Sequence, residues 1–200
     1  MKINIRKNIK DIYYNISLNV KFRNENKIFT HLTNEEKLEL FKLAKTSSGI
    51  FVEIGSYLGA SACFIAKGIV SNKTKGSLLY CVDTWKNDAM SEGIRDNYKA
   101  FLKNIKTYKH IIIPLRGYSV EIAKSFNNKI DFIFIDGDHS YEGVSSDVKS
   151  WLPKIKDEGI IVFHDIGWSE GVKRTVEEFV KPIIKQERLL SNLYWARIHH

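Results

Sequence analysis

Ionisable side chains follow two short apolar runs in this sequence, residues 130–135 and 159–163. Each run is typical of a buried strand. If the two strands are parallel neighbours, the polar clusters emerge at the same carboxyl edge of one sheet, where α/β proteins bind their ligands. Carboxylates and imidazoles gathered there could hold a divalent metal beside a substrate. The side chains concerned are Asp136, Asp138 and His139 after the first run, and His164 and Asp165 after the second.

His139 is the candidate general base of this group, because an imidazole titrates near neutral pH. The alternative is structural: His139 could orient Asp136 or cap the helix that is expected from Tyr141. Asp138 could likewise support the metal ligands or act as an anion at the helix N-terminus. Trp168, just beyond the second pair, either walls an acceptor pocket or packs in the core. The sequence leaves these choices open.

Gly55 and Gly59 lie between an expected strand and helix, in the segment FVEIGSYLGASA. Glycine permits a tight turn and a close approach of the backbone to a ligand, and the helix N-terminus offers free amide donors. Turn geometry alone would also explain these glycines. The spacing departs from G-x-G-x-x-G, which disfavours a pyrophosphate cradle and with it a nicotinamide oxidoreductase. Glu53, near the strand end, could attract an amine-bearing ligand.

The next two strand ends complete the pattern of a nucleoside site. Asp83 ends the run LLYCVD and could accept hydrogen bonds from two ribose hydroxyls. Trp85 could lie against an adenine or a substrate, or pack on the neighbouring helix. The third strand ends at Gly117, Tyr118 and Ser119, and Ser119 could meet a base, cap the next helix, or do both.

The elements that must position these residues alternate regularly from residue 50 onward. Such alternation predicts an α/β fold, a mostly parallel sheet with helices on both faces. Before it, Thr33 and Glu36 match a capping box for a helix over 34–46, and after it two runs around Ser191 predict an antiparallel hairpin. Strands are expected at 50–54, 78–82, 111–115, 130–135 and 159–163, helices at 60–70, 91–105, 119–126, 141–152 and 170–180, and the hairpin at 183–190 and 193–198.

The composition fits one globular domain, since 200 residues with 44% hydrophobic content suffice for a single core. We expect residues 32–200 to form that domain and residues 1–31 to add an arm or helix that covers the active site or mediates homodimer contacts. The sequence shows neither a bilayer-spanning apolar run nor the apolar core of a signal peptide, so a cytoplasmic location is expected. Cys63 and Cys81 are expected as buried, reduced thiols.

The net charge of +8 raises the alternative of a basic, noncatalytic nucleic-acid-binding module. The lysines, however, are spread along the chain and form no dense arginine-rich block. A solvated, lysine-rich surface is therefore the favoured interpretation, and a nucleic-acid partner is not expected.

The motifs together resemble a class I S-adenosylmethionine-dependent methyltransferase with a Rossmann-like, seven-stranded sheet. The resemblance covers about residues 32–180 and is carried by VEIGSYLGAS, VDTW, DFIFIDGDHSYEGV and a glycine-led strand that ends in HD. A small bacterial family shares these motifs. Its layout is similar to that of the catechol and caffeoyl-coenzyme A O-methyltransferases and of the macrocin and cephalosporin-type enzymes, in which a divalent metal orients substrate oxygens.

The resemblance implies a place for each site residue. Asp136 occupies the first metal-binding position and, with His139, is counted as catalytic. His164 and Asp165 replace the family's Asp-Asn pair, a departure that keeps the ligand set suitable for magnesium or manganese and tilts it toward softer metals. The cofactor contacts implied are Glu53, Gly55 and Ser61 beside the methionine part, with Ser56, Tyr57 and Gly59 in the same turn, Asp83 at the ribose, Trp85 beside it, Gly117, Tyr118 and Ser119 near the adenine, and Asp136.

The expected function is O-methylation of a small hydroxylated metabolite or sugar, assisted by a divalent metal. The alternative inside the same class is a metal-independent or N-directed methyltransferase, in which Asp136, His164 and Asp165 only bind substrate. One sequence does not identify the acceptor, because a fold and its cofactor site serve many substrates.

Overall fold

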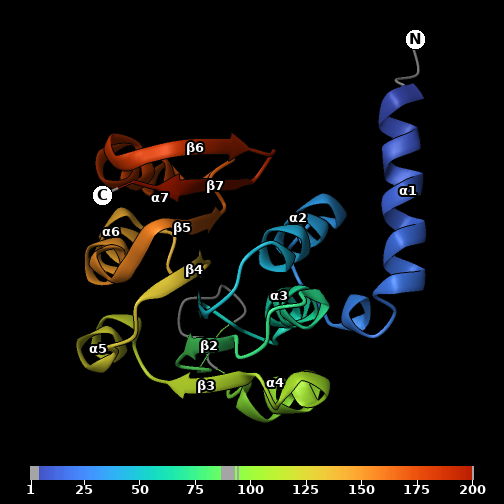
Figure 1. The fold of residues 1–200 in the computed structure, drawn as a ribbon, viewed down its shortest axis with the longest axis horizontal. Coiled ribbons are helices and arrows are strands. Elements are labelled where there is room, and N and C mark those ends of the chain that lie inside the picture. Colours follow the sequence, from blue (N-terminus) through green and yellow to red (C-terminus); the bar gives the residue numbers. More distant parts are fainter. Residues whose placement is uncertain (1–4, 87–92, 94, 200) are drawn as a thin grey trace.

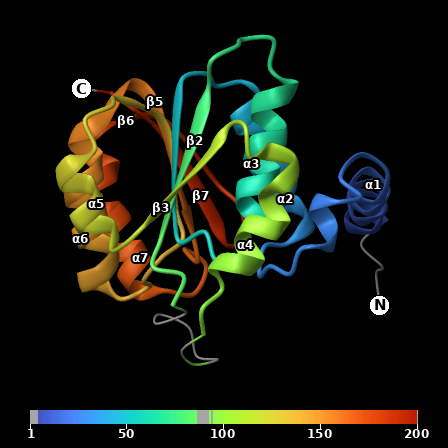
Figure 2. The ribbon, with the colours of Figure 1, turned by 90° about the horizontal axis from the view of Figure 1, so that it is seen from below.

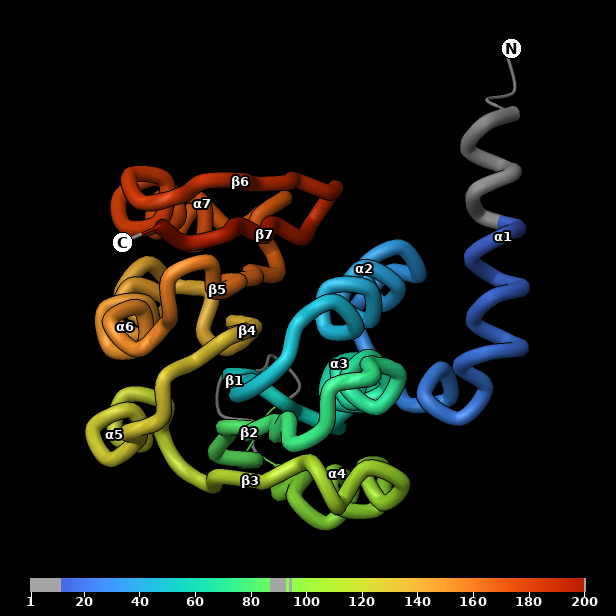
Figure 3. Tube along the Cα trace, viewed as in Figure 1, coloured from blue at the N-terminus to red at the C-terminus, as the bar shows by residue number. Residues whose placement is uncertain are grey.

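The expected alternation produces a seven-stranded sheet in the computed structural model, which describes residues 5–86, 93 and 95–199, with side chains from residue 12 onward (Figure 3). The strand order is β3-β2-β1-β4-β5-β7-β6. The first five strands in that order are parallel, and the last two are antiparallel additions. The predicted Rossmann-like fold with a C-terminal hairpin is confirmed. The strands are β1 (Ile50–Ile54), β2 (Leu78–Asp83), β3 (Ile112–Arg116), β4 (Ile130–Ile135), β5 (Ile155–His164), β6 (Ile184–Leu189) and β7 (Leu193–Ile198).

Helices cover both faces of this sheet (Figures 1 and 2). Helices α2, α3 and α4 lie on one face and α5, α6 and α7 on the other, while α1 lies outside α2 and α3. The helices are α1 (Ile5–Lys21), α2 (Asn34–Lys45), α3 (Ala60–Ser71), α4 (Tyr98–Asn104), α5 (Ser119–Ser125), α6 (Tyr141–Trp151) and α7 (Glu170–Thr175), with short 3-10 turns at Glu25–Lys27, Ile105–Tyr108, Leu152–Lys154 and Lys181–Ile183 and a π-helical turn at Val176–Val180.

Alternate residues of the central strands feed two separate cores. Phe51 of β1 packs on Phe132 of β4, with ring centroids 5.3 Å apart, in the core beneath α2 and α3. The next residue, Val52, points to the opposite core beneath α5, α6 and α7. Burial on both faces explains why these strands read as continuous apolar runs. No helix in the described ranges is long and apolar enough to cross a membrane.

The predicted capping box is present at the start of α2. The Thr33 hydroxyl accepts a hydrogen bond from the Glu36 amide at 3.4 Å, and the Glu36 carboxylate accepts one from the Thr33 amide at 2.7 Å. On the outer side, Leu18 and Phe22 at the end of α1 pack against Leu38 of α2 and Phe64 of α3. Cys63 and Cys81 are buried and free, as predicted.

Two predicted boundaries are wrong by several residues, the others agree to within one residue, and the predicted helix 170–180 is divided into α7 and the π-helical turn. Strand β5 begins at Ile155 instead of residue 159. The sequence did not predict this start because Lys156 to Glu158 are polar and exposed and carry no apolar signal. Helix α4 begins at Tyr98 instead of residue 91; of the predicted range, 91, 92 and 94 lie outside the described residues. The amide of Asn97 bonds the Trp85 carbonyl at 2.9 Å, which ties this segment to the loop after β2 instead of to a helix.

Candidate active site

The turn between β1 and α3 brings the backbone against the end of β4. Gly55 and Gly59 have φ angles of 83° and 84°, in the left-handed region that glycine adopts without strain. A Cβ atom at Gly55 would lie 2.0 Å from the Asp136 carbonyl oxygen. Glycine is therefore required for the two strand ends to approach this closely.

Asp83 is fixed at the end of β2 by two backbone donors. Its Oδ2 accepts a hydrogen bond from the Tyr57 amide at 2.8 Å, and its Oδ1 accepts one from the Trp85 amide at 2.6 Å. An ionised carboxylate offers about four acceptor sites, so a group of this type can serve backbone donors and ligand hydroxyls together. Its position at the carboxyl edge is the one expected from the sequence.

Trp85 packs on the neighbouring helix, which was one of the two alternatives for it. The side chain is 1% exposed, and its ring centroid lies 4.8 Å from that of Tyr98 and 4.6 Å from that of Phe101. Its indole nitrogen donates to the Tyr57 carbonyl oxygen at 3.0 Å. The tryptophan thereby holds the loop that carries Asp83 against α4.

Glu53 is fully buried behind the glycine turn. Burial raises the pKa of its carboxyl to about 7, although contacts with Ser56, Ser61 and Cys81 favour the ionised form. The Cys81 thiol lies 3.4 Å from Glu53 Oε2. Glu53 thus supports the turn from inside the molecule and does not open onto its surface.

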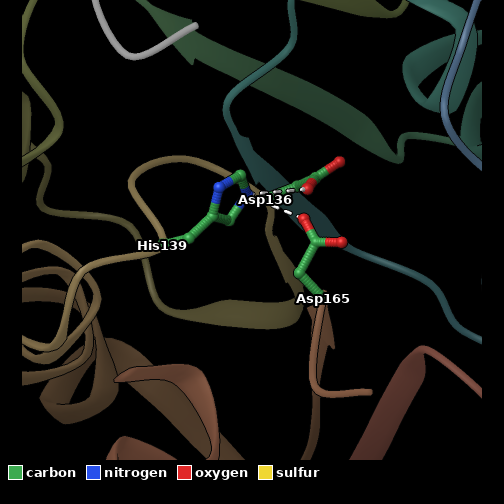
Figure 4. A group of neighbouring side chains, drawn as sticks. All are labelled: Asp136, His139 and Asp165. Carbon is green, nitrogen blue, oxygen red and sulfur yellow. Dashed lines mark ion pairs between the residues drawn. The ribbon is translucent and has the colours of Figure 1, made fainter. Parts of the chain in front are cut away.

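Asp136, His139 and Asp165 converge at the carboxyl edges of β4 and β5 (Figure 4). His139 Nε2 lies 2.8 Å from Asp165 Oδ2 and 3.9 Å from Asp136 Oδ1. The ligand atoms of the three side chains all lie within 4.8 Å of one another. This spacing suits a single small cation held in common.

His164 contacts the same two carboxylates. Its Nδ1 lies 3.2 Å from Asp136 Oδ1 and 3.3 Å from Asp165 Oδ2, and the ring is 3% exposed. His139 is the more open of the two rings. The structure thus places two histidines on one pair of carboxylates. The ligand set expected from the sequence contained the same two carboxylates but only one histidine, His164.

The carboxylates raise the pKa of both histidines. Contacts with Asp136 and then Asp165 raise the pKa of His139 to about 9. Burial lowers the pKa of His164, but Asp136, Asp165 and Glu36 outweigh it and raise that pKa to about 12. Burial also opposes ionisation of Asp165, yet the two histidines hold its pKa well below the usual range. The rings therefore neutralise the carboxylates, and a bound cation would compete with their protons.

Two residues that the sequence assigned to structure alone also reach this cluster. Asn192, between β6 and β7, donates from Nδ2 to Asp165 Oδ1 at 2.9 Å, and the same nitrogen lies 3.3 Å from His164 Nε2. Glu36 Oε2 lies 3.5 Å from His164 Nε2. In the sequence, the polar hairpin turn explains Asn192 and the capping box explains Glu36. Nothing in the sequence therefore indicated that either residue reaches the site.

Two cavities open at this edge and share a wall formed by Gly55, Tyr57 and Asp136. The first has a volume of about 530 Å³ and contains the histidine and carboxylate cluster. The second, of about 430 Å³, contains Asp83 and the turn after β3. Among the predicted site residues, Ser56, Ser61, His139, His164 and Asp165 line the first cavity, Asp83, Trp85, Gly117, Tyr118 and Ser119 line the second, and Glu53 and Gly59 line neither.

Aromatic side chains form the outer wall of the first cavity. Trp168 is 60% exposed, and its indole nitrogen donates to Asp165 Oδ1 at 2.6 Å. Phe29 and His31, from the segment after α1, line the same cavity with ring centroids 5.2 Å apart. Trp168 therefore lies at the cavity and not in the core, and Phe29 and His31 of the range predicted as an N-terminal arm line the same cavity.

Comparison with known proteins gives a family match. Residues 52–166, more than half of the chain, match the model of a family described as a methyltransferase domain. The uncharacterized protein y4gI of Sinorhizobium fredii is 27% identical over 120 residues, which are 57% of this chain and 13% of that protein. The uncharacterized protein R132 of Acanthamoeba polyphaga mimivirus is 27% identical over 139 residues, 66% of this chain and 60% of that protein. The chain thus spans less than two thirds of either relative.

Solved structures share the fold. The S-adenosylhomocysteine-bound methyltransferase PaMTH1 of Podospora anserina has a TM-score of 0.71 and 14% identity, covering 100% of this chain and 98% of that one. The O-methyltransferase NovP has a TM-score of 0.70 and 13% identity, covering 86% and 82%. An O-methyltransferase of Bacillus cereus in complex with S-adenosylhomocysteine has a TM-score of 0.66 and 13% identity, covering 94% and 90%. At this level of identity the likeness concerns the fold.

Proposed function

This chain belongs to the methyltransferase domain family, and from that premise we propose that it transfers the methyl group of S-adenosylmethionine to an oxygen of a small hydroxylated acceptor, assisted by a divalent metal. One observation carries the proposal: Asp136 lies in the wall shared by two cavities of different character. A methyl transfer requires donor and acceptor to meet in line at about 3 Å. A shared wall provides such a meeting point.

The second cavity is proposed to hold the donor. Asp83 would accept hydrogen bonds from the ribose hydroxyls, and the turn at Gly117, Tyr118 and Ser119 would lie beside the base. Gly55 and Tyr57, which also border the first cavity, would face the methionine part. This arrangement would direct the sulfonium toward Asp136 and the first cavity.

The first cavity is proposed to hold the acceptor. Its aromatic wall of Phe29, His31 and Trp168 offers flat apolar faces, and its floor offers Asp136 and Asp165. Flat faces over a polar floor suit an aromatic diol or a sugar ring.

The donor set fits a divalent cation. Nε2 of His139 is buried between two carboxylates, yet among the described residues it has no hydrogen bond of good geometry. Asp136 and Asp165, with His164 or His139 as the nitrogen ligand, would hold magnesium or manganese. When bound, the ion would lower the pKa of an acceptor hydroxyl and fix the position of its oxygen.

His139 is proposed as the general base. It is the more open of the two histidines, it lines the first cavity, and its ring lies 5.3 Å from that of Trp168. Asp136 and Asp165 raise the pKa of His139, so a bound cation would first have to displace the ring proton; the neutral ring could then remove the acceptor proton as the methyl group moves. His164, which is more deeply buried and braced by Glu36 and Asn192, suits the role of ligand.

Chelation tests the metal. After treatment with EDTA, methyl transfer to a panel of vicinal diols, with catechol and simple sugars as first members, is expected to fall about tenfold or more and to return with Mn²⁺ or Mg²⁺. Formation of S-adenosylhomocysteine provides the assay, and calorimetric titration of Mn²⁺ provides a readout that needs no acceptor. Activity indifferent to EDTA, with no Mn²⁺ binding, would leave the metal-independent alternative.

Replacing Asp83 tests the donor. The variant Asp83→Ala is expected to bind S-adenosylhomocysteine about a hundredfold more weakly, because two hydrogen bonds to a charged acceptor are worth about 3 kcal/mol together. Calorimetry measures the affinity, and thermal melting separates lost binding from lost folding. Asp157→Ala, which removes an exposed carboxylate on the opposite edge of the sheet, is the matched control. Unaltered binding by Asp83→Ala would remove Asp83 from the donor site, and no binding by the wild-type protein would overturn the donor assignment.

A further inference from the structure

Asp147 is a buried carboxylate in the second cavity for which the sequence indicated no role. It lies on the inner face of α6, where its neighbours Val144, Val148 and Trp151 are buried in the core beneath the sheet. The side chain is 6% exposed and lines the cavity together with Gly137 and Ser119. An acid among apolar neighbours, open only toward a cavity, is placed to meet what enters that cavity.

The protein offers few groups that offset the cost of burying this carboxylate. Burial raises its pKa to about 6, a contact with the Ser119 hydroxyl opposes the rise, and the charge of Asp138 adds to it. No basic side chain in the described part of the chain pairs with Asp147. Ser119 accepts a hydrogen bond from the Trp151 indole at 2.7 Å, so its own proton is free to point toward Asp147. Acceptor capacity on Asp147 remains for a ligand.

The layout of the second cavity indicates which part of a nucleoside would reach Asp147. With the ribose on Asp83, the base can extend either toward Trp85 or toward the turn at Ser119. Toward Trp85 the wall is an indole ring whose nitrogen donates to the Tyr57 carbonyl, so this side chain offers no acceptor for a purine amine. The second direction leads between the start of α5 and the inner face of α6, where Ser119 and Asp147 lie.

We propose that Asp147 recognises the adenine of the methyl donor by accepting a hydrogen bond from its exocyclic amine. This inference rests on the proposed donor, S-adenosylmethionine. Asp147 on α6 would then distinguish a 6-aminopurine from a 6-oxopurine, because a carboxylate attracts the amine and repels a carbonyl oxygen at the same position. Tyr118, which is 61% exposed at the rim of the cavity, would cover the base from outside.

The test compares S-adenosylhomocysteine with S-inosylhomocysteine by calorimetry; in the second ligand a carbonyl replaces the 6-amine and the adjacent N1 carries a proton. The wild-type protein is expected to prefer the adenosyl ligand by about tenfold or more, as for a hydrogen bond to a charged group. In Asp147→Asn the preference is expected to disappear or reverse, because the carboxamide can donate to the inosyl oxygen. Asp147→Ala should lose the preference without reversal.

The control is Glu142→Gln, which removes an exposed carboxylate from the first turn of the same helix, outside the cavity, and should keep the adenosyl preference. Thermal melting adds a second readout. At pH 7 an ionised, buried Asp147 with a pKa of about 6 destabilises the folded state, so Asp147→Asn should raise the Tm of the unliganded protein. A folded Asp147→Asn protein with the wild-type preference would overturn the inference. No binding of either ligand to the wild-type protein would overturn the donor assignment, and the inference with it.

Discussion

The variant Asp165→Ala is expected to lower the rate of methyl transfer by on the order of a hundredfold to a thousandfold while leaving the affinity for S-adenosylhomocysteine unchanged. Asp165 contacts both histidines of the cluster, at 2.8 Å and 3.3 Å, and lines only the first cavity. Its loss removes a proposed metal ligand and releases His139 without touching the donor cavity. The assay measures S-adenosylhomocysteine formed from the best diol of the panel, at saturating donor.

Two further measurements make the Asp165 result specific. Calorimetry should show that Mn²⁺ binding is lost in Asp165→Ala, whatever the acceptor is. The backbone at Asp165 has φ 60°, which asparagine adopts more readily than alanine, so Asp165→Asn controls for strain in this turn. Loss of donor affinity together with activity would show that the two cavities do not work separately, and would contradict the division of roles proposed for them.

His139→Gln is expected to lower kcat by about a hundredfold to ten-thousandfold and to keep Mn²⁺ binding, since a general base typically contributes that much. His164→Gln is expected to act mainly on metal binding. Its Mn²⁺ affinity should fall about tenfold or more, and activity should recover in part at high Mn²⁺. The pair of variants assigns the two rings that share Asp136 and Asp165.

The opposite outcome would exchange the roles of the two histidines. If His139→Gln loses Mn²⁺ affinity and His164→Gln does not, then the group formed by Asp136, His139 and Asp165 is the ligand set, and His139 is not the base. Full activity in His139→Gln would exclude it from both roles. Melting curves for each variant report whether the fold is intact.

The fold was predictable from the sequence wherever a local pattern carried it. The capping box at Thr33 and Glu36, the buried strand 130–135 and the hairpin around Ser191 all have signals within a few residues, and each is found. The start of α4 was missed because the Asn97 amide donates a hydrogen bond to the Trp85 carbonyl, a contact that local helical propensity does not reveal. The start of β5 was missed because its exposed polar residues lack the alternation that marks a strand.

The candidate site residues were also predictable where a local pattern, here the end of a strand, carried them. Residues at strand ends, such as Asp83, Asp136 and Asp165, follow from the rule that parallel strands present their carboxyl ends at one edge. Asp147 and Asn192 reach the site from a helix interior and a distant hairpin, and only the folded chain brings them there. The roles of the predicted residues stay predictions until the variants above are measured.

Glu36 performs two tasks with one carboxylate. It closes the first turn of α2 by accepting the Thr33 amide, and it lies against the ring of His164. A substitution that relaxes the helix end therefore also changes the electrical surroundings of the imidazole, and a change at the imidazole is felt by the helix. One substitution at Glu36 thus reaches both the stability of the helix start and the charge around the cluster.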